Sequence, residues 1–183
     1  MEQMFPVFST KNLTFGPVTY HDASDIFKLF SDPETMSLDG GQTMKSMEEA
    51  FEFVRFYSVY QPHFPILRRA VRSKVTGEFY GTGGFYKIDA KNQKAEIGGE
   101  LLKDHWKKGI ASEALAGFIS YGFDVLNFNR ITAMISTKNK SANRLINKSP
   151  FKYEGCLRQW EKWGDKWMDI NVYSLLREER PLT

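Results

Sequence analysis

The feature that most limits the fold is a basic glycine turn, His105–Leu115 (H-W-K-K-G-I-A-S-E-A-L), between an apolar run and a long amphipathic segment. The apolar run, Ile97–Leu102, has the length of a strand, and the segment that begins near Gly109 has helical periodicity. The first N–H groups of a helix have no partner inside it, and the helix dipole adds partial positive charge there. Lys107 and Lys108 place two further positive charges just before that helix. The order of strand, basic glycine turn and helix start therefore predicts a site for a phosphate or a diphosphate.

The same residues also have a simpler explanation, because many helices begin near a glycine and two lysines often mark only a solvated turn. The turn contains neither the G-x-x-x-x-G-K-[ST] pattern of a P-loop nor the G-x-G-x-x-G pattern of a dinucleotide site. Gly109 has no Cβ, and Ala111 and Ser112 are small, so a ligand can approach this backbone closely. The rest of the chain decides between the two explanations.

The composition is that of a globular protein with a sizeable core. At 183 residues, of which 42% are hydrophobic and 26% charged, we expect a single domain over residues 1–183. The net charge of +3 is too small to indicate a nucleic-acid partner, and no apolar run approaches the roughly 20 residues that span a bilayer. The single cysteine, Cys156, excludes an internal disulfide, and the widely spaced histidines predict no metal site. The first ten residues lack the pattern of a signal peptide, so a cytoplasmic location is expected.

Hydrophobic periodicity predicts an α/β chain with a mixed sheet. Period-two runs indicate strands at 13–17, 66–73, 79–88, 94–102, 131–137, 151–163 and 167–176. Helical runs lie at 22–31, 46–57, 109–126 and 139–149, and Asp22, Ser46 and Asn139 are expected to be N-caps. The glycines at 81, 83 and 84 lie inside a predicted strand, where close packing explains them better than a phosphate loop does. The order β-α-α-β-β-β-α-β-α-β-β therefore predicts one α/β domain.

Three segments together resemble the GNAT superfamily of N-acetyltransferases, and its RimJ/RimL-type branch in particular. The first, A-E-I-G-G-E-L-L-K-D-H-W-K-K-G-I-A-S-E-A from Ala95, is similar to the branch's strand and pyrophosphate motif, with Trp106 three residues before the central glycine. The second is N-R-I from Asn129, followed by N-K-S-A-N-R-L-I-N-K-S-P-F-K-Y-E-G from Asn139. The third is D-I-N-V-Y-S-L-L-R-E-E from Asp169. The resemblance implies a mixed, largely antiparallel sheet of about seven strands flanked by about four helices.

The resemblance also implies acetyl-CoA as the acetyl donor and a primary amine as the acceptor, without a metal. In this family, the strand that matches residues 95–102 splays from the one that matches 131–137. The pantetheine arm lies in that opening and bonds to the backbone near Leu101 and Leu102, and Asn139 matches an asparagine that contacts the arm. The turn is expected to hold the diphosphate through Lys107, Lys108, Gly109, Ile110, Ala111 and Ser112.

Acetyl transfer requires a neutral amine, whereas an alkylammonium has a pKa of about 10. The site therefore needs a proton acceptor and hydrogen-bond donors for the oxyanion. Glu96 lies where many GNAT enzymes carry a base, and Glu100 faces the same side of the strand. Both carboxylates are explained equally well as solvated or ion-paired strand residues. The expected oxyanion donor is a backbone N–H near Leu102.

Three positions depart from the family pattern. Ile146 stands where many GNAT enzymes carry a tyrosine that acts as an acid toward the thiolate. Ala142 replaces a serine that is frequent in the RimL-type branch, which makes the neighbouring Ser141 hydroxyl a third catalytic candidate. Lys148–Phe151 reads K-S-P-F in place of K-x-G-F. Because a free thiol has a pKa of about 8.5, the CoA thiolate can leave without a dedicated acid.

The acceptor site is expected between the two N-terminal helices and the final hairpin. The tryptophans are candidate walls, although they are explained equally well as cross-strand pairs or subunit contacts: Trp106, Trp160, Trp163 and Trp167. The first hypothesis for the acceptor is a protein N-terminal amine of the ribosomal-protein type. The alternatives are a small amine, such as an amino sugar, polyamine or antibiotic, and a CoA-binding module without turnover. An open groove would favour a peptide and a closed acidic cup a small cation, while the many aromatic residues are compatible with a homodimer.

Overall fold

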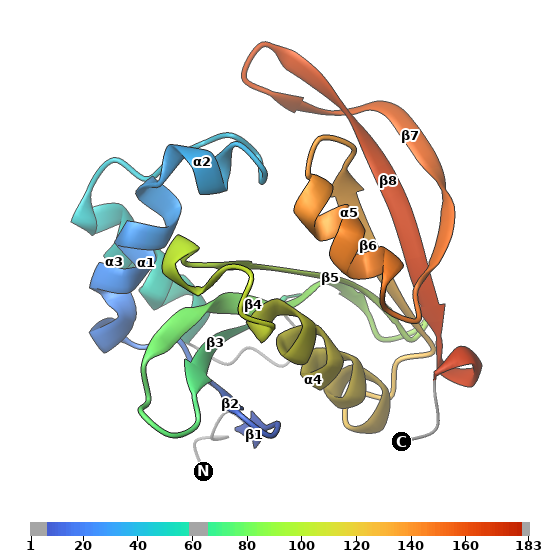
Figure 1. The fold of residues 1–183 in the computed structure, drawn as a ribbon, viewed down its shortest axis with the longest axis horizontal. Coiled ribbons are helices and arrows are strands. Elements are labelled where there is room, and N and C mark those ends of the chain that lie inside the picture. Colours follow the sequence, from blue (N-terminus) through green and yellow to red (C-terminus); the bar gives the residue numbers. More distant parts are fainter. Residues whose placement is uncertain (1–6, 59–65, 181–183) are drawn as a thin grey trace.

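The computed structural model describes residues 7–58 and 66–180, and these residues form an eight-stranded sheet with helices on both faces (Figure 1). The strands lie in the order β1-β2-β3-β4-β5-β6-β8-β7. All neighbouring strands are antiparallel except β5 and β6, which are parallel. The strands are β1 (Phe8–Ser9), β2 (Leu13–Gly16), β3 (Leu67–Ser73), β4 (Phe79–Asp89), β5 (Lys94–Leu101), β6 (Arg130–Ser136), β7 (Lys152–Trp163) and β8 (Lys166–Leu176).

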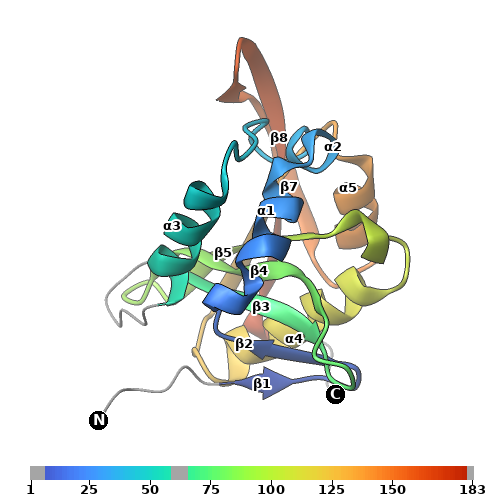
Figure 2. The same cartoon turned by 90° about the vertical axis from the view of Figure 1, so that its left-hand side faces the viewer.

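The helices pack on opposite faces of the sheet (Figures 1 and 2). They are α1 (Ala23–Ser31), α2 (Pro33–Met36), α3 (Met47–Ser58), α4 (Ile110–Asp124) and α5 (Lys140–Asn147). On one face, α1 and α3 form an apolar cluster with Ala70 of β3. On the other face, α4 and α5 form a larger cluster with the neighbouring Val71 and with β6 and β8. This division follows from the two-residue period of the strands, which sends successive side chains to opposite faces.

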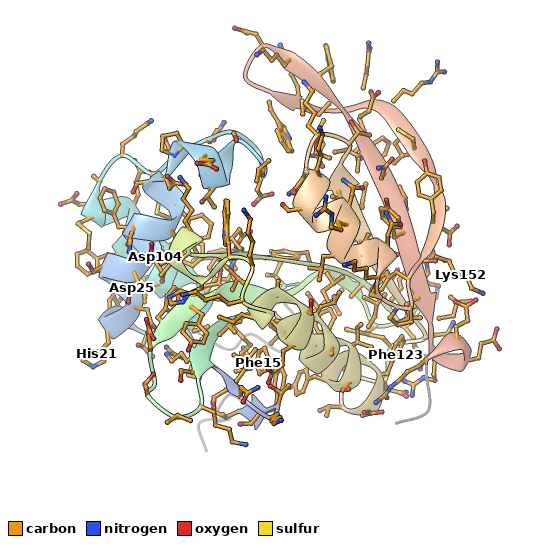
Figure 3. All side chains as sticks on the ribbon, viewed as in Figure 1. Phe15, His21, Asp25, Asp104, Phe123 and Lys152 are labelled. Atoms are coloured by element: carbon orange, nitrogen blue, oxygen red, sulfur yellow. The ribbon has the colours of Figure 1, made fainter. Side chains whose placement is uncertain are left out.

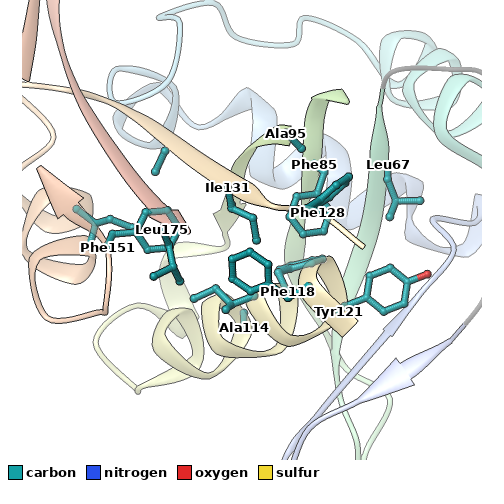
Figure 4. Packing of buried hydrophobic residues seen from close by; sticks show 14 of the residues in the cluster. Leu67, Phe85, Ala95, Ala114, Phe118, Tyr121, Phe128, Ile131, Phe151 and Leu175 are labelled. Atoms are coloured by element: carbon teal, nitrogen blue, oxygen red, sulfur yellow. The ribbon is translucent and has the colours of Figure 1, made fainter. Parts of the chain in front are cut away.

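Close packing fixes α4 against the sheet. Phe118 is buried, and its ring meets the edges of Phe15 and Phe85 at centroid distances of 4.9 and 6.0 Å (Figure 4). A Cβ at Gly122 would lie 2.8 Å from the Phe85 ring, so only glycine lets the helix come this close. At the other end of the helix, Glu113 accepts hydrogen bonds from the β1–β2 turn at 2.5, 2.7 and 2.9 Å. These contacts hold the N-terminal turn of α4 to the β1–β2 turn.

The two parallel strands separate halfway along their length. β5 and β6 pair only over Lys94–Ile97 and Arg130–Ala133. Beyond this point β5 stays paired with β4, through Leu101, whereas β6 stays paired with β8, through Ser136. The opening between the two strands is the feature that positions the site described below.

The structure confirms the predicted mixed, largely antiparallel sheet, with two small additions. The short strand β1 and the helix α2 were not predicted. The sequence Asp32-Pro33 predicts the end of a helix, but it also begins the next one. Asp32 caps α2 by accepting the Thr35 N–H at 2.7 Å, and Pro33 occupies the first turn of α2. In the described part of the chain, no helix is long and apolar enough to cross a membrane.

Two predicted N-caps have different outcomes. Asn139 caps α5 as expected, because its Oδ1 accepts the Ala142 N–H at 3.0 Å. The prediction for Asp22 was wrong, since its carboxylate makes no capping bond to α1. It accepts the Thr19 N–H at 2.7 Å and pairs with Arg72 of β3 at 2.5 Å. The partly buried Arg72 competes with the helix N-terminus for the carboxylate, and sequence alone does not show this partner.

Candidate active site

A cavity of about 420 Å³ lies where β5 and β6 separate. Its walls come from β4, β5, β6, α4 and α5, and β7 and the segment that follows α2 also contribute lining residues. Side chains from both sides project into the space between the α2 segment and the β7–β8 hairpin (Figure 3). The lining of the cavity therefore extends from the strand opening to segments that are distant in the sequence.

The N-terminus of α4 presents an open turn beside this cavity. Gly109 is the N-cap residue, with φ 81° and ψ −8°, a left-handed conformation that favours glycine. The first intrahelical bond runs from the Glu113 N–H to the Gly109 carbonyl at 3.1 Å, so the N–H groups of Ile110, Ala111 and Ser112 precede the hydrogen-bonded ladder. A Cβ at Gly109 would meet no atom within 4 Å. The turn thus combines free space with N–H donors, and the exposed Lys107 and Lys108 add positive charge.

The backbone of Leu101 faces the strand opening. The Leu102 N–H donates to the Tyr80 carbonyl of β4 at 2.9 Å. Because backbone groups alternate in direction along a strand, the N–H and C=O of Leu101 point the other way, toward β6. The Trp106 indole donates to the Leu101 carbonyl at 2.7 Å, which leaves the Leu101 N–H as the donor that faces the opening.

The sequence analysis expected the oxyanion donor near Leu102, and the structure distinguishes Leu102 from Leu101. The Leu102 N–H is bonded to β4, and its side chain is 5% exposed in the cluster beneath α1 and α3. The N–H that faces the opening is that of Leu101. The strand alternation reverses at each residue, so a shift of one position changes the direction of the N–H group.

The α5 N-terminus brings Asn139 to the cavity but not Ser141. Asn139 lines the cavity, and its Oδ1 accepts bonds from the Ala142 N–H and the Ser141 hydroxyl, each at 3.0 Å. Ser141 itself is exposed and outside the cavity lining, because the helix turns Ala142 inward instead. The position of Ser141 thus gives no support to its expected catalytic role. Ile146 is buried at the cavity wall.

Glu96 and Glu100 both lie at the cavity and on the same face of β5, as their spacing predicts. Glu96 is ion-paired with Lys87 of β4, whose Nζ lies 3.0 Å from Oε1. Glu100 forms an ion pair with Arg68 and accepts a hydrogen bond from the Thr82 hydroxyl at 3.2 Å. The Glu100 side chain is only 10% exposed. Each carboxylate already has a basic partner.

Sequence reasoning missed a third carboxyl group, that of Asp39. Asp39 lies in the segment after α2, which folds back so that the Gly41 N–H donates to the Met36 carbonyl at 2.7 Å. Although Asp39 as a whole residue is exposed to solvent, it contributes to the lining of the cavity. Removal of this carboxyl from water, together with the nearby Glu100 carboxylate, raises the pKa of Asp39 to about 7. The only sequence signal was the following Gly40-Gly41 pair, which marks a sharp turn.

The segment after α2 touches both α5 and β7. The Asn139 Nδ2 lies 3.5 Å from the Leu38 carbonyl oxygen. A Cβ at Gly41 would lie 3.7 Å from the Trp163 Cβ. Glu161 of β7 also lines this end of the cavity and accepts a bond from the Trp163 indole at 2.9 Å.

The tryptophans have separate roles. Trp163 lines the cavity, which agrees with its expected role as a wall of the site. Trp106 supports the Leu101 backbone through its indole N–H. Trp160 and Trp167 are 53% and 55% exposed on the β7–β8 hairpin. Trp167 lies opposite Lys162. Across residues 7–58 and 66–180, no group of three or more acidic, histidine or cysteine side chains is arranged to hold a metal ion.

Two parallel strands that separate beside an open, basic helix N-terminus are typical of one class of protein, the acyltransferases that bind coenzyme A thioesters. Residues 12–152 match the family model described as "Acetyltransferase (GNAT) domain". The chain belongs to this family and is an acetyl-CoA-dependent N-acetyltransferase. The family predicted from the sequence motifs is therefore confirmed.

Individual proteins show the same relationship. The chain is 36% identical to the uncharacterized N-acetyltransferase YoaA of Bacillus subtilis over 174 residues, which cover 95% of this chain and 98% of that protein. It is 32% identical to the ribosomal-protein-serine acetyltransferase of Escherichia coli over 97 residues, 53% of this chain and 54% of that protein. The fold is similar to that of spermidine N-acetyltransferase from Vibrio cholerae, solved with CoA and spermine. That comparison has a TM-score of 0.81 at 20% identity and covers 93% of this chain and 98% of the other.

Proposed function

We propose that the protein transfers the acetyl group of acetyl-CoA to the primary amine of a small cationic acceptor. The observation that carries this proposal is the acidic lining of the part of the cavity to which the segment after α2 contributes. Asp39, Glu100 and Glu161 supply three carboxyl groups there, and Arg68 supplies one positive charge. A protonated amine is attracted to such a site, which favours the small-amine alternative over the protein N-terminus expected first.

The position of the segment after α2 supports a small acceptor. Leu38 and Asp39 of this segment line the cavity, and the Leu38 carbonyl oxygen lies 3.5 Å from the Asn139 Nδ2. A compact amine needs only this lining, whereas an extended peptide needs a groove along which its backbone continues.

We propose Asp39 as the proton acceptor. A base works best when its pKa lies near the operating pH, and the pKa of Asp39 is raised to about 7. Asp39 removes a proton from the ammonium group, and the neutral nitrogen then bonds to the acetyl carbon as the carbon–sulfur bond breaks. The nitrogen loses its second proton to the departing CoA thiolate, so the products are the amide and free CoA thiol. The Leu101 N–H is the proposed donor to the oxygen of that carbonyl. Glu96 remains a second candidate base, although its pairing with Lys87 makes it a poorer one.

The cofactor site proposed for acetyl-CoA uses the rest of the cavity. The pantetheine arm fits the opening between β5 and β6, beside Leu101 and Asn139. The diphosphate fits the turn of residues 107–112, where the free space at Gly109 accommodates a ligand. Acetyl-CoA supplies the activated acetyl group in the reaction.

A panel of acceptors tests the proposed function. CoA release is measured with wild-type protein and acetyl-CoA against polyamines, amino sugars and peptides with free N-termini. We expect the highest kcat/KM with one of the small amines. Asp39→Asn should lower turnover by about 10²- to 10⁴-fold, the usual contribution of a general base, and leave acetyl-CoA binding intact in calorimetry.

A peptide preference in this panel would overturn the small-amine proposal and favour the protein N-terminus. The likeness to the E. coli ribosomal-protein-serine acetyltransferase keeps that function as the second candidate. Unchanged turnover in Asp39→Asn, with Glu96→Gln impaired, would move the base to Glu96.

A further inference from the structure

We propose that Glu96 is a specificity-determining residue, which binds a second cationic group of the acceptor at the end of the cavity remote from the reacting amine. The acceptor is then a diamine, or a larger molecule with two cationic groups, rather than a monoamine. This role deepens the proposed function and rests on it, because it takes the acceptor to be a small cation. It differs from the role of a base, and the two roles predict different kinetics.

The strand β5 forms a floor of the cavity with a carboxyl group at each end. Glu96, Gly98 and Glu100 lie on one face of β5, because alternate residues of a strand point to the same side, and all three line the cavity. The position between the two carboxyl groups has no side chain, and a Cβ at Gly98 would lie 3.3 Å from the Tyr86 Cε2. The residue opposite Gly98 on β4 is also a glycine, Gly84. The floor between the carboxyl groups therefore consists of backbone and an aromatic ring, surfaces that suit an alkyl chain.

The two carboxyl groups differ in how firmly they are held. Glu100 pairs with the buried Arg68 and accepts the Thr82 hydroxyl at 3.2 Å, both through Oε2, and its side chain is only 10% exposed. The Glu96 side chain is 27% exposed, and its Oε1 lies 3.0 Å from the Nζ of Lys87, a side chain that is 69% exposed. Exposed ion pairs contribute little to stability, so a cationic group of a ligand can replace Lys87 at Glu96.

The proposed place of the acetyl group puts Glu96 at the far end of the floor. The proposed oxyanion donor is the N–H of Leu101, which directly follows Glu100, so the reacting nitrogen lies at the Glu100 end. Glu96 precedes Leu101 by five residues, or about 16 Å along a strand. A monoamine leaves Glu96 paired with Lys87, whereas a diamine of matching length brings its second ammonium group to Glu96.

The charges of the cavity lining also favour an acceptor with two positive charges. Among the described residues that line the cavity, the carboxyl groups are those of Asp39, Glu96, Glu100 and Glu161, and the guanidinium is that of Arg68. This guanidinium is already paired with Glu100. A second positive charge on the acceptor therefore offsets more of the negative charge of the lining than a single one does.

The test compares α,ω-diaminoalkanes, from the propane to the octane member, with n-alkylamines of equal chain length. CoA release gives kcat/KM for wild type, Glu96→Gln and Glu96→Asp. We expect the wild type to prefer a diamine to its matched alkylamine, and Glu96→Gln to lower this preference about tenfold, the effect of one hydrogen bond to a charged group. Glu96→Asp keeps the charge but withdraws it by one methylene group, so the preferred diamine should become longer.

Two lysine variants separate the local competition from a general effect of charge. Lys87→Met removes the cation that competes for Glu96, so the preference for the diamine should increase. Lys91→Met removes an equal charge in the turn between β4 and β5 and should leave the preference at the wild-type value. Thermal unfolding shows which variants are folded. If Glu96→Gln does not fold, the direction of the changes in Glu96→Asp and Lys87→Met decides.

The matched amines distinguish a failure of this inference from a failure of the proposed function. An equal loss of kcat/KM for diamines and alkylamines in Glu96→Gln would overturn the inference, because a base or a structural residue affects both alike, and the proposed function would stand. Equal kcat/KM for the two kinds of amine in the wild type would have the same meaning. If the wild type acetylates no small amine, the proposed function fails, and calorimetric titration of the CoA complex with the diamines decides the inference. Diamine binding that is weaker in Glu96→Gln supports it, and binding that is absent or unaffected overturns it.

Discussion

Substitution of Gly109 tests the proposed diphosphate site most directly. Gly109 has φ 81°, and a Cβ there would meet no atom within 4 Å. Gly109→Glu should therefore fold, at a cost of about 1–2 kcal/mol for placing a side chain in the left-handed region. The new carboxylate would lie beside the N–H groups of Ile110 and Ala111, where the diphosphate is expected. We predict a marked loss of acetyl-CoA affinity.

The size of the loss follows from Coulomb's law. At a separation of about 6 Å in an exposed, water-like environment, one pair of charges interacts by about 0.7 kcal/mol. Two phosphate charges therefore give about 1.4 kcal/mol, or roughly a tenfold weaker Kd. Gly109→Gln has a similar side chain without the charge, so the ratio of the two variants isolates the electrostatic effect. This ratio should shrink as salt is raised, because the site is exposed.

Gly77→Glu is a matched control for backbone strain. Gly77 lies in the turn between β3 and β4, has φ 75°, and would also give its Cβ no neighbour within 4 Å. Both glutamate variants should lose similar stability in denaturant unfolding, but only Gly109→Glu should lose acetyl-CoA affinity in calorimetric titration. Equal acetyl-CoA affinities in the two folded variants would refute the assignment of the turn to the diphosphate.

Three further substitutions test the supports of the site. Trp106→Phe removes the indole bond to the Leu101 carbonyl, so it should cost about 1 kcal/mol in denaturant unfolding and raise the KM for acetyl-CoA; an unchanged KM would contradict its supporting role. Asn139→Ala removes the α5 cap and should lower the free energy of unfolding by about 1 kcal/mol, or the Tm by roughly 2–4 °C. Ser141→Ala is the control, and equal Tm values for the two variants would argue against this cap. Burial opposes ionisation of Glu113, but bonds from the β1–β2 turn outweigh it and lower its pKa. The stability that this carboxylate contributes is therefore present above about pH 4.5 and lost as the pH falls further. Glu113→Gln should make the free energy of unfolding, measured at about pH 3–6, less dependent on pH.

The cofactor half of the site was predictable from the sequence because it is built from local backbone geometry. The apolar run before the turn and the helical period after it place Gly109 at the start of α4, and a helix start exposes N–H groups whatever its side chains are. Asn139 was found for the same reason, since capping is a local property. The expected oxyanion donor was placed only near Leu102, because a one-residue change reverses the direction of the backbone in a strand and the sequence does not show which N–H is already paired with β4.

The acceptor half was less predictable because it depends on pairs of charges that are distant in the sequence. Glu100 was identified from strand alternation, but its ion-pair partner Arg68 lies two strands away in the sheet. Asp39 lies in a segment without periodicity, and its pKa is raised first by removal of the carboxyl from water and then by the Glu100 charge, both of which arise only in the folded chain. No local pattern marks any of these three residues as partners.

This difference between the two halves has a consequence for specificity. The proposed contacts to the cofactor are made largely by backbone groups of β5 and α4, so side-chain substitutions change them little. The acceptor end depends instead on the charges of Asp39 and Glu161, which belong to the α2 segment and β7 rather than to the strands that separate. Substitutions in these two segments can therefore change which amine binds while the acetyl-CoA site is kept. On this basis, exchanging Glu161 should alter the ranking of acceptors before it alters the affinity for acetyl-CoA.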